Sequence, residues 1–200
     1  MSELFPTDPR ERQDKVKEIV TEVVTRPEIE SFLSGYSLSI VEVEMKNHNM
    51  DVCADTSNSR ELRIRYSANF CELPISYFRA VLFHELGHIR NEDIFLNFVK
   101  MFLNGIYVIS VLLLALKLRS FWFAAIGTFV AILFETIFLK TYNFWKREFA
   151  ADDFSAQHNS PQDLIAFFEF MRSTYNDDFF FTHPSYARRI ARLKGKYGIN

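Results

Sequence analysis

One short stretch of the sequence, HELGH, combines residue types that bind a metal ion and use it. The stretch contains His84, Glu85 and His88. Positions i and i+4 of a helix project from one face, so the two imidazoles can bind a single zinc ion. Glu85 then reaches a water on that ion and can take its proton as the water attacks a carbonyl. The spacing predicts a catalytic zinc site, with two surface histidines on an ordinary helix as the alternative.

A catalytic zinc ion needs a third protein ligand and an open fourth position. Glu92 and Asp93 follow HELGH too closely on the same predicted helix to fold back onto the ion. Glu148 is the better candidate, because it and Asp152 stand at i and i+4 in EFAAD. Asp152 could accept the free N–H of a bound imidazole and so fix its tautomer. Taken alone, EFAAD favours a solvated acidic face.

Three motifs follow one another along the chain: FHELGHIRNED, then KREFAAD, then THPSYARRIARL, with an apolar stretch between the first two. In this order they resemble the HtpX and CAAX prenyl protease type of membrane zinc endopeptidases, over roughly residues 60–195. The resemblance implies that His84, His88 and Glu148 bind a Zn²⁺ ion. It also implies that Glu85 is the general base and that Asp152 contacts a ligand histidine, expected to be His84.

The resemblance further implies roles for two residues near the C-terminus. His183 is expected to approach the site and stabilise the oxyanion of the tetrahedral intermediate, and Arg189 to support it structurally or electrostatically. The alternative for His183 is a helix-capping or packing role.

Two departures and one weaker resemblance leave the substrate open. HtpX-like proteins usually carry a further pair of transmembrane helices before HExxH, where this chain has an amphipathic helix. The multi-helix prenyl protease is far larger, so its substrate chamber cannot be carried over. HELGHIRNED also resembles the antirepressor peptidases of the BlaR type.

Composition excludes several classes of protein. Apolar residues at 48% and charged residues at 24% exclude a disordered chain. A net charge of −2 gives no reason to expect a nucleic-acid partner. Two cysteines cannot make a disulfide framework, which favours a reducing compartment.

Hydrophobic periodicity predicts the elements that position the motifs. It predicts an amphipathic helix from Pro9 to about Thr25, strands at 37–45 and 61–68, and a helix over 75–95 that carries HELGH. Further helices are expected after residue 141. The strand at 61–68 is expected either to be an edge that holds an extended substrate or to be an ordinary strand of a small sheet.

Two uncharged stretches, 101–116 and 120–134, predict a transmembrane helical hairpin, with a buried helix pair as the alternative. The charged N-terminus makes a cleaved secretory signal unexpected. Basic residues beside the apolar stretches modestly favour the inner (cytoplasmic) membrane with the catalytic part facing the cytoplasm.

The sequence therefore predicts an α+β, gluzincin-like zincin fold in three parts. Residues 1–93 hold the N-terminal helix, small sheet and HExxH helix, residues 94–140 the apolar hairpin, and residues 141–200 the third ligand. The predicted function is zinc-dependent hydrolysis of peptide bonds in polypeptide substrates, plausibly unfolded or membrane proteins. A catalytically silent membrane zinc sensor or structural protein is the rival, although such a protein has no need of Glu85.

Overall fold

The computed structural model describes residues 3–43, 52–55, 61–91, 141–175 and 183–199, together with separate positions between 102 and 130. The described chain is α+β and mostly helical, with one small sheet. Its elements are α1 (Pro9–Val24), α2 (Pro27–Leu33), β1 (Ser37–Val43), β2 (Val52–Asp55), β3 (Glu61–Ser67), the 3-10 helix η2 (Ala68–Glu72), α3 (Ile75–Arg90), α6 (Thr141–His158), α7 (Pro161–Thr174) and α8 (Tyr186–Tyr197).

The sheet has three strands in the order β1-β3-β2. β3 pairs in parallel with β1 and antiparallel with β2. Leu62, Ile64 and Tyr66 of β3 are buried, as the alternation of apolar and polar residues predicted. The idea that β3 is an edge strand is wrong, because neighbours occupy both of its hydrogen-bonding edges. The edges of this sheet are β1 and β2.

The N-terminal region forms two helices where the sequence predicted one. Asp8 caps α1 by accepting hydrogen bonds from the backbone N–H groups of Arg10 and Glu11. The predicted stop near Pro27 is correct for α1, which ends at Val24, but Pro27 is also the first residue of α2. Proline is tolerated there because the first N–H groups of a helix have no partner within it.

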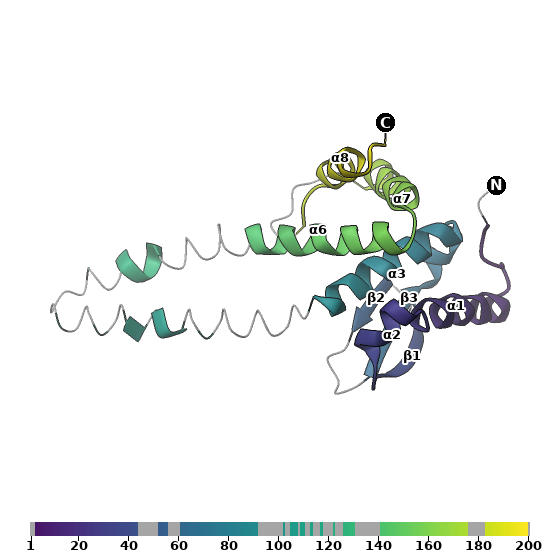
Figure 1. Cartoon of the computed structure of the whole chain (residues 1–200), viewed down its shortest axis with the longest axis horizontal. Helices are drawn as coiled ribbons and strands as arrows, with labels where there is room; N and C mark the ends of the chain where they lie inside the picture. Colours follow the sequence, from purple (N-terminus) through teal and green to yellow (C-terminus); the bar gives the residue numbers. More distant parts are fainter. Residues whose placement is uncertain are drawn as a thin grey trace.

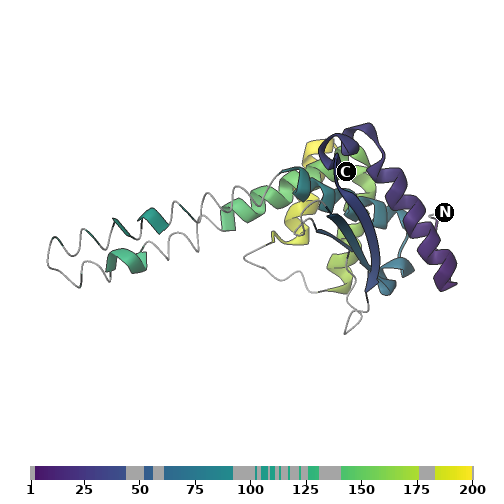
Figure 2. The same cartoon turned by 90° about the horizontal axis from the view of Figure 1, so that it is seen from below.

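Helix α3 lies between the sheet and helices α6 and α7 (Figures 1 and 2). It begins after Pro74, as predicted, and buries Phe78, Leu82 and Leu86 completely. Glu22 of α1 links α1 to this helix at the surface, because its carboxylate accepts two hydrogen bonds from Arg79, at 2.7 and 2.6 Å. The helix that carries HELGH is thus supported on several sides.

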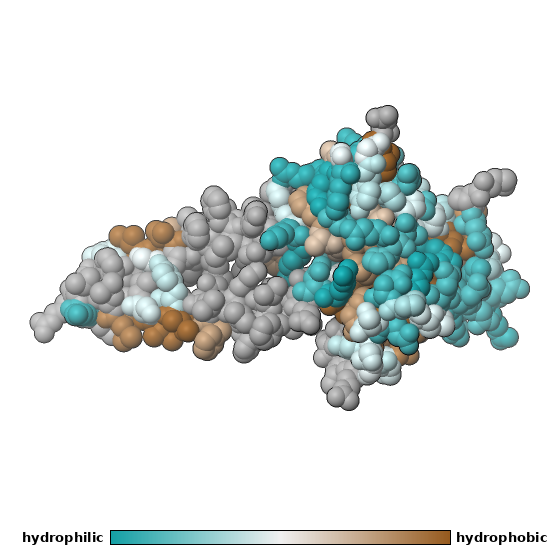
Figure 3. Space-filling model, in the orientation of Figure 1, coloured by the Kyte–Doolittle hydropathy of each residue, from teal (hydrophilic) through white to brown (hydrophobic). Residues whose placement is uncertain are grey.

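The predicted hairpin at 94–140 lies mostly outside the described residues. Among the residues that are described, no helix is long and apolar enough to cross a membrane. The described positions between 102 and 130 are helical, lie well away from the sheet, and expose apolar side chains (Figures 1 and 3). At these positions the alternative of a buried helix pair is wrong. The large exposed side chains are Phe102, Ile106, Tyr107, Ile109, Leu113, Trp122, Ile126, Phe129 and Val130.

Candidate metal centre

The contact between α3 and α6 brings the two distant motifs together. A Cβ atom on Gly87 would lie 3.0 Å from Cα of Ala151 and 3.1 Å from Cβ of Phe154, so only glycine lets the helices approach this closely. Beside this contact, the buried Ser155 hydroxyl donates a 2.6 Å hydrogen bond to the carbonyl of Ala80. The glycine of HELGH therefore positions α6 against the histidines of α3.

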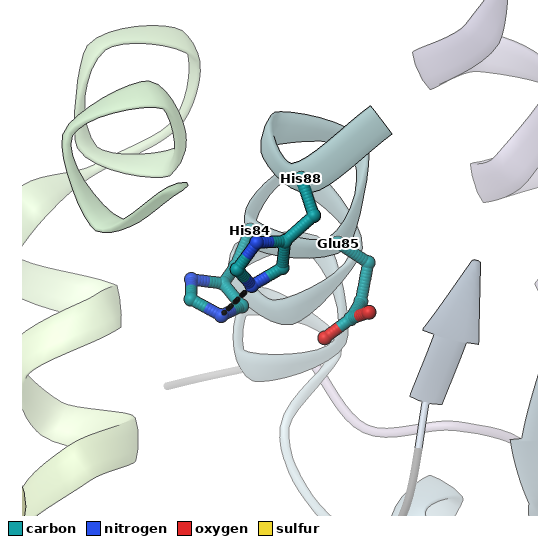
Figure 4. Close-up of side chains that lie close together, drawn as sticks. All are labelled: His84, Glu85 and His88. Atoms are coloured by element: carbon teal, nitrogen blue, oxygen red, sulfur yellow. Dashed lines mark hydrogen bonds between the residues drawn. The ribbon is translucent and has the colours of Figure 1, made fainter. Parts of the chain in front are cut away.

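The HELGH side chains converge on one point of α3. Nε2 of His84 lies 3.2 Å from Nε2 of His88, and the two rings meet edge to face. Possible ligand atoms of His84, Glu85 and His88 all lie within 4.8 Å of one another. Figure 4 shows the two imidazoles in contact and the Glu85 carboxylate beside them. Two surface histidines on an ordinary helix do not describe this arrangement, because His84 is buried.

Glu148 of α6 completes a triangle with the two histidines. Its carboxylate oxygens lie 3.5 Å from Nε2 of His84 and 3.4 Å from Nε2 of His88. A tetrahedral zinc ion with bonds of about 2.0–2.1 Å separates its ligand atoms by about 3.3–3.4 Å. Two imidazoles and a carboxylate are also a ligand set that zinc uses, so these three side chains fit a zinc ion in both geometry and chemistry.

Asp152 stands one turn after Glu148 and faces the other nitrogen of the same imidazole. Its Oδ1 lies 3.0 Å from Nδ1 of His84, so an Nδ1–H donated to Asp152 leaves Nε2 available to a metal. The side chain of Asp152 is completely buried. A solvated acidic face, which EFAAD alone favoured, is therefore wrong for both carboxylates.

Arg189 of α8 neutralises this buried carboxylate. Its Nε donates a 3.0 Å hydrogen bond to Oδ2 of Asp152 and its Nη2 donates to Oδ1, in a two-pronged pairing. The guanidinium also stacks on Phe168, with Cζ 4.0 Å from the ring centroid. Nη1 lies 3.5 Å from the Glu148 carboxylate. Arg189 thus contacts both acidic residues of EFAAD.

The pKa values of these groups shift in the directions that favour an ionised network. Burial alone would raise the pKa of Glu148, but hydrogen bonds with His183, His84 and His88 lower it below its usual range. Burial would also raise the pKa of Asp152, and the charge of Arg189 outweighs it and lowers that pKa. Burial would lower the pKa of His84, whereas Asp152 and Glu148 raise it. Both carboxylates are therefore held in their negative form.

His183 lies at the rim of the same cluster. Its Nδ1 is 3.1 Å from Oε1 of Glu148, and 60% of its side chain is exposed to solvent. The cap of α8 is instead Ser185, whose hydroxyl accepts a hydrogen bond from the N–H of Arg188. The alternative of His183 as a helix cap is wrong, because Ser185 performs that function.

Sequence reasoning missed three contributors to this site: Gly87, Ala151 and Phe168. The available signal for the first two was a pair of small residues, one within each motif, on helices that had to meet. Phe168 had no such signal, because its stacking on Arg189 depends on how α7 and α8 pack.

The comparisons with known proteins place the chain in a family. The model of peptidase family M48 matches residues 75–197, a range that includes both halves of the cluster. This chain belongs to peptidase family M48. Membership agrees with the resemblance to the HtpX and CAAX protease type that was drawn from the three motifs. No curated protein matches the chain.

Among solved structures, the chain is similar to the crystal structure of Ste24p from S. mikatae. The TM-score is 0.60 at 12% sequence identity, and the match covers 89% of this chain and 55% of that one. At this identity the likeness concerns the fold alone. This M48 chain spans about half the length of that one.

Proposed function

We propose that this M48 peptidase is a zinc-dependent endopeptidase attached to a membrane by its apolar segment. The observation that carries the proposal is the convergence of His84, His88 and Glu148. The two Nε2 atoms lie 3.2 Å apart, and each lies 3.4 or 3.5 Å from one of the two oxygens of the Glu148 carboxylate, separations close to those between ligand atoms of a tetrahedral zinc ion. These three residues would hold the ion. When bound, zinc supplies Lewis-acid chemistry that lowers the pKa of a water and polarises a peptide carbonyl.

Glu85 is the proposed general base. It sits next to His84 in sequence, and its carboxylate lies within 4.8 Å of the ligand atoms of both histidines. In this role Glu85 takes a proton from the attacking water and then gives it to the leaving amine. Glu85 is half-buried, so substrate and water can both reach it.

Asp152 and Arg189 are the proposed positioning residues. Asp152 holds Nδ1–H of His84, which fixes the tautomer in which Nε2 carries a free lone pair. Arg189 compensates the charge of Asp152 and keeps the carboxylate oriented.

His183 is the proposed stabiliser of the oxyanion. It is exposed at the edge of the cluster and lies beside Glu148, so an N–H of its ring can turn toward a substrate carbonyl. In the structure, Nδ1 of this imidazole lies 3.1 Å from Oε1 of Glu148.

The substrate is proposed to be an extended polypeptide that adds to the sheet edge at β2. This short strand contacts α3, the helix that bears HELGH, and β3 occupies only one of its edges. An extended chain on the other edge would satisfy main-chain hydrogen bonds in the way that sheet edges bind peptides. β2 thereby takes the role that was one of the two alternatives for β3.

Attachment to a membrane is proposed from the apolar segment. The large apolar side chains described between 102 and 130 are exposed, with Trp122 at 73% and Phe129 at 65%. Water makes such exposure costly, at roughly 25 cal/mol for each Å² of apolar surface, whereas lipid does not. We propose the inner membrane, with the catalytic part on its cytoplasmic side and the three-part domain organisation set out above.

Proteolysis by wild type and Glu85→Gln, measured on an unfolded protein such as reduced casein, tests the proposed activity. The expected result is hydrolysis by wild type only, with a chelator abolishing it and both proteins binding zinc equally. Equal hydrolysis by Glu85→Gln contradicts the role of Glu85. Zinc binding without hydrolysis by wild type favours the sensor or structural protein.

A further inference from the structure

Basic and aromatic side chains gather where α6 begins and α8 packs beside it. We call Trp145, Lys146, Arg147 and Arg188 the α6–α8 basic cluster. The Arg188 guanidinium lies over the Trp145 ring, with Cζ 4.5 Å from the centroid. Arg147 stacks on Phe144 in the same way, at 5.7 Å. Lys146 and Arg188 are exposed, so their charges face solvent.

The position of this cluster connects the apolar segment to the metal centre. The start of α6 is the part of that helix nearest the projecting segment in Figure 1, and Figure 3 shows exposed apolar surface on that segment. An apolar segment followed by tryptophan and cationic side chains is typical of the boundary between membrane and water. Each Lys or Arg near an anionic lipid surface contributes about 1 kcal/mol of attraction.

We infer that the α6–α8 basic cluster binds the anionic headgroups of the membrane in which the apolar segment is inserted. This inference rests on the proposed membrane attachment and adds a defined second contact to it. Trp145 and Arg188 lie at the headgroup level as a stacked pair, which keeps an aromatic face and a positive charge in the same place.

The cluster fixes the distance between the metal centre and the lipid. Trp145 and Glu148 are three residues apart on α6, which corresponds to a rise of about 4.5 Å. The zinc ligands then lie within about one helical turn of the headgroups. Peptide bonds reach this centre when they lie at the membrane surface, so the substrate class is the loops and tails of membrane proteins next to their spans.

The two tryptophans of the chain, Trp122 and Trp145, allow the two contacts to be measured separately. Trp122→Phe leaves Trp145 as the single reporter of the cluster, and Trp145→Phe leaves Trp122 as the reporter of the apolar segment. Each full-length variant is reconstituted in vesicles of phosphatidylcholine and phosphatidylglycerol, with bromine atoms at shallow or deep acyl positions. We expect Trp145 to be quenched more by shallow than by deep bromine, and Trp122 to be quenched by bromolipid.

The outcomes separate this inference from the proposed attachment. If bromolipid quenches Trp122 but not Trp145, and aqueous iodide quenches Trp145, then the inference that the cluster binds headgroups is wrong. The proposed attachment through the apolar segment is not affected by that result. Absence of quenching at both tryptophans overturns the attachment and the cluster together.

A charge reversal tests the role of anionic headgroups. In the Trp122→Phe background, half-maximal quenching of Trp145 requires a certain fraction of phosphatidylglycerol. Lys146→Glu should raise that fraction several-fold, and added salt should raise it too. The matched control is Lys17→Glu, which reverses an exposed charge on α1, at the end of the molecule opposite the projecting segment (Figure 1). This variant should leave the phosphatidylglycerol dependence unchanged. An unchanged phosphatidylglycerol dependence in Lys146→Glu overturns the inference.

Discussion

The α3–α6 contact and the apolar segment place polar and apolar residues in opposite surroundings. At the contact, charged side chains are buried: Asp152 is completely inaccessible, and Glu148 and Arg189 are each 6% exposed. In the described part of the segment, large apolar side chains such as Trp122 and Phe129 face outward. A buried charge is tolerated only when it is paired, and an exposed apolar surface only when something covers it. The charges of the first region are paired within the chain, whereas nothing among the described residues covers the apolar side chains of the second.

Among these variants, Arg189→Met should cause the largest loss of unfolding free energy, because it disrupts the buried charges at the α3–α6 contact. It removes the guanidinium that pairs with Asp152 and leaves this buried carboxylate with His84 alone, which costs about 3–5 kcal/mol of unfolding free energy. Urea unfolding monitored by circular dichroism measures this loss. The neighbouring pair of Arg192 and Asp153 is the matched control, since it joins the same two helices near the surface. Arg192→Met should cost about 0–1 kcal/mol, and equal losses in both variants would show that burial does not matter here.

Gly87→Ala should push α3 and α6 apart and lower the unfolding free energy by less than Arg189→Met does. The new methyl group meets the backbone of Ala151 at 3.0 Å, so the helices must move apart at a cost of about 1–3 kcal/mol. Thermal unfolding measures it, and zinc affinity should fall as Glu148 moves away from the histidines. Gly195→Ala on α8 is the control, because no atom lies within 4 Å of its added methyl group. That variant should gain about 0.5–1 kcal/mol, the usual benefit of alanine over glycine within a helix.

Polar substitutions in the apolar segment should leave the stability of the folded body unchanged. Ile126→Ser with Phe129→Ser alters side chains that are exposed already, so the unfolding free energy should change by less than about 0.5 kcal/mol. Retention in the membrane fraction after carbonate washing should decrease. Leu164→Ala, at a completely buried position, should instead cost about 2–5 kcal/mol and leave retention unchanged. A large loss of stability in the double variant would mean that the segment packs against the body.

Acid stability should show a small effect at the ion pair between Glu22 of α1 and Arg79 of α3. Hydrogen bonds from Arg79 outweigh burial and, with those from Arg26, lower the pKa of Glu22 from 4.5 to about 2. A lowered folded-state pKa stabilises the fold above pH 4.5, and this contribution is lost as the pH falls toward 2. Because Glu22 is half-exposed, the loss should stay below about 1 kcal/mol. Glu22→Gln should flatten the dependence of unfolding free energy on pH between 5 and 2, and an unchanged slope would contradict the assignment.

The helices and the metal cluster could be predicted from sequence because their signals are local. The period of Val16, Ile19, Val20 and Val23 marks α1, and all four side chains are buried. HELGH and EFAAD each fix the spacing of two side chains on one helical face. The remaining question for prediction was whether the two helices lie side by side in the fold. The order of three motifs along the chain indicated that they do.

The strand order could not be predicted, because it depends on pairing between distant segments. β2 has only four residues and follows no long alternating pattern, so it was missed. Without β2, an edge position for β3 stayed open as one of two alternatives. The approach of α3 to α6 at Gly87 was also missed. Gly87 and Ala151 form a pair of small residues, but the sequence does not show which backbone the glycine will meet.

The zinc content of Glu148→Ala tests most directly the claim that α3 and α6 together build one metal centre. Wild type, Glu148→Ala and Asp153→Ala are purified in detergent, and bound zinc per chain is measured by atomic emission after dialysis. Asp153 lies on the same helix and pairs with Arg192 and Lys196, so its variant controls for loss of an acidic residue on α6. We predict one zinc per chain in wild type and in Asp153→Ala, and a large reduction in Glu148→Ala. Full zinc occupancy in Glu148→Ala would contradict the account, because the third ligand would then lie elsewhere.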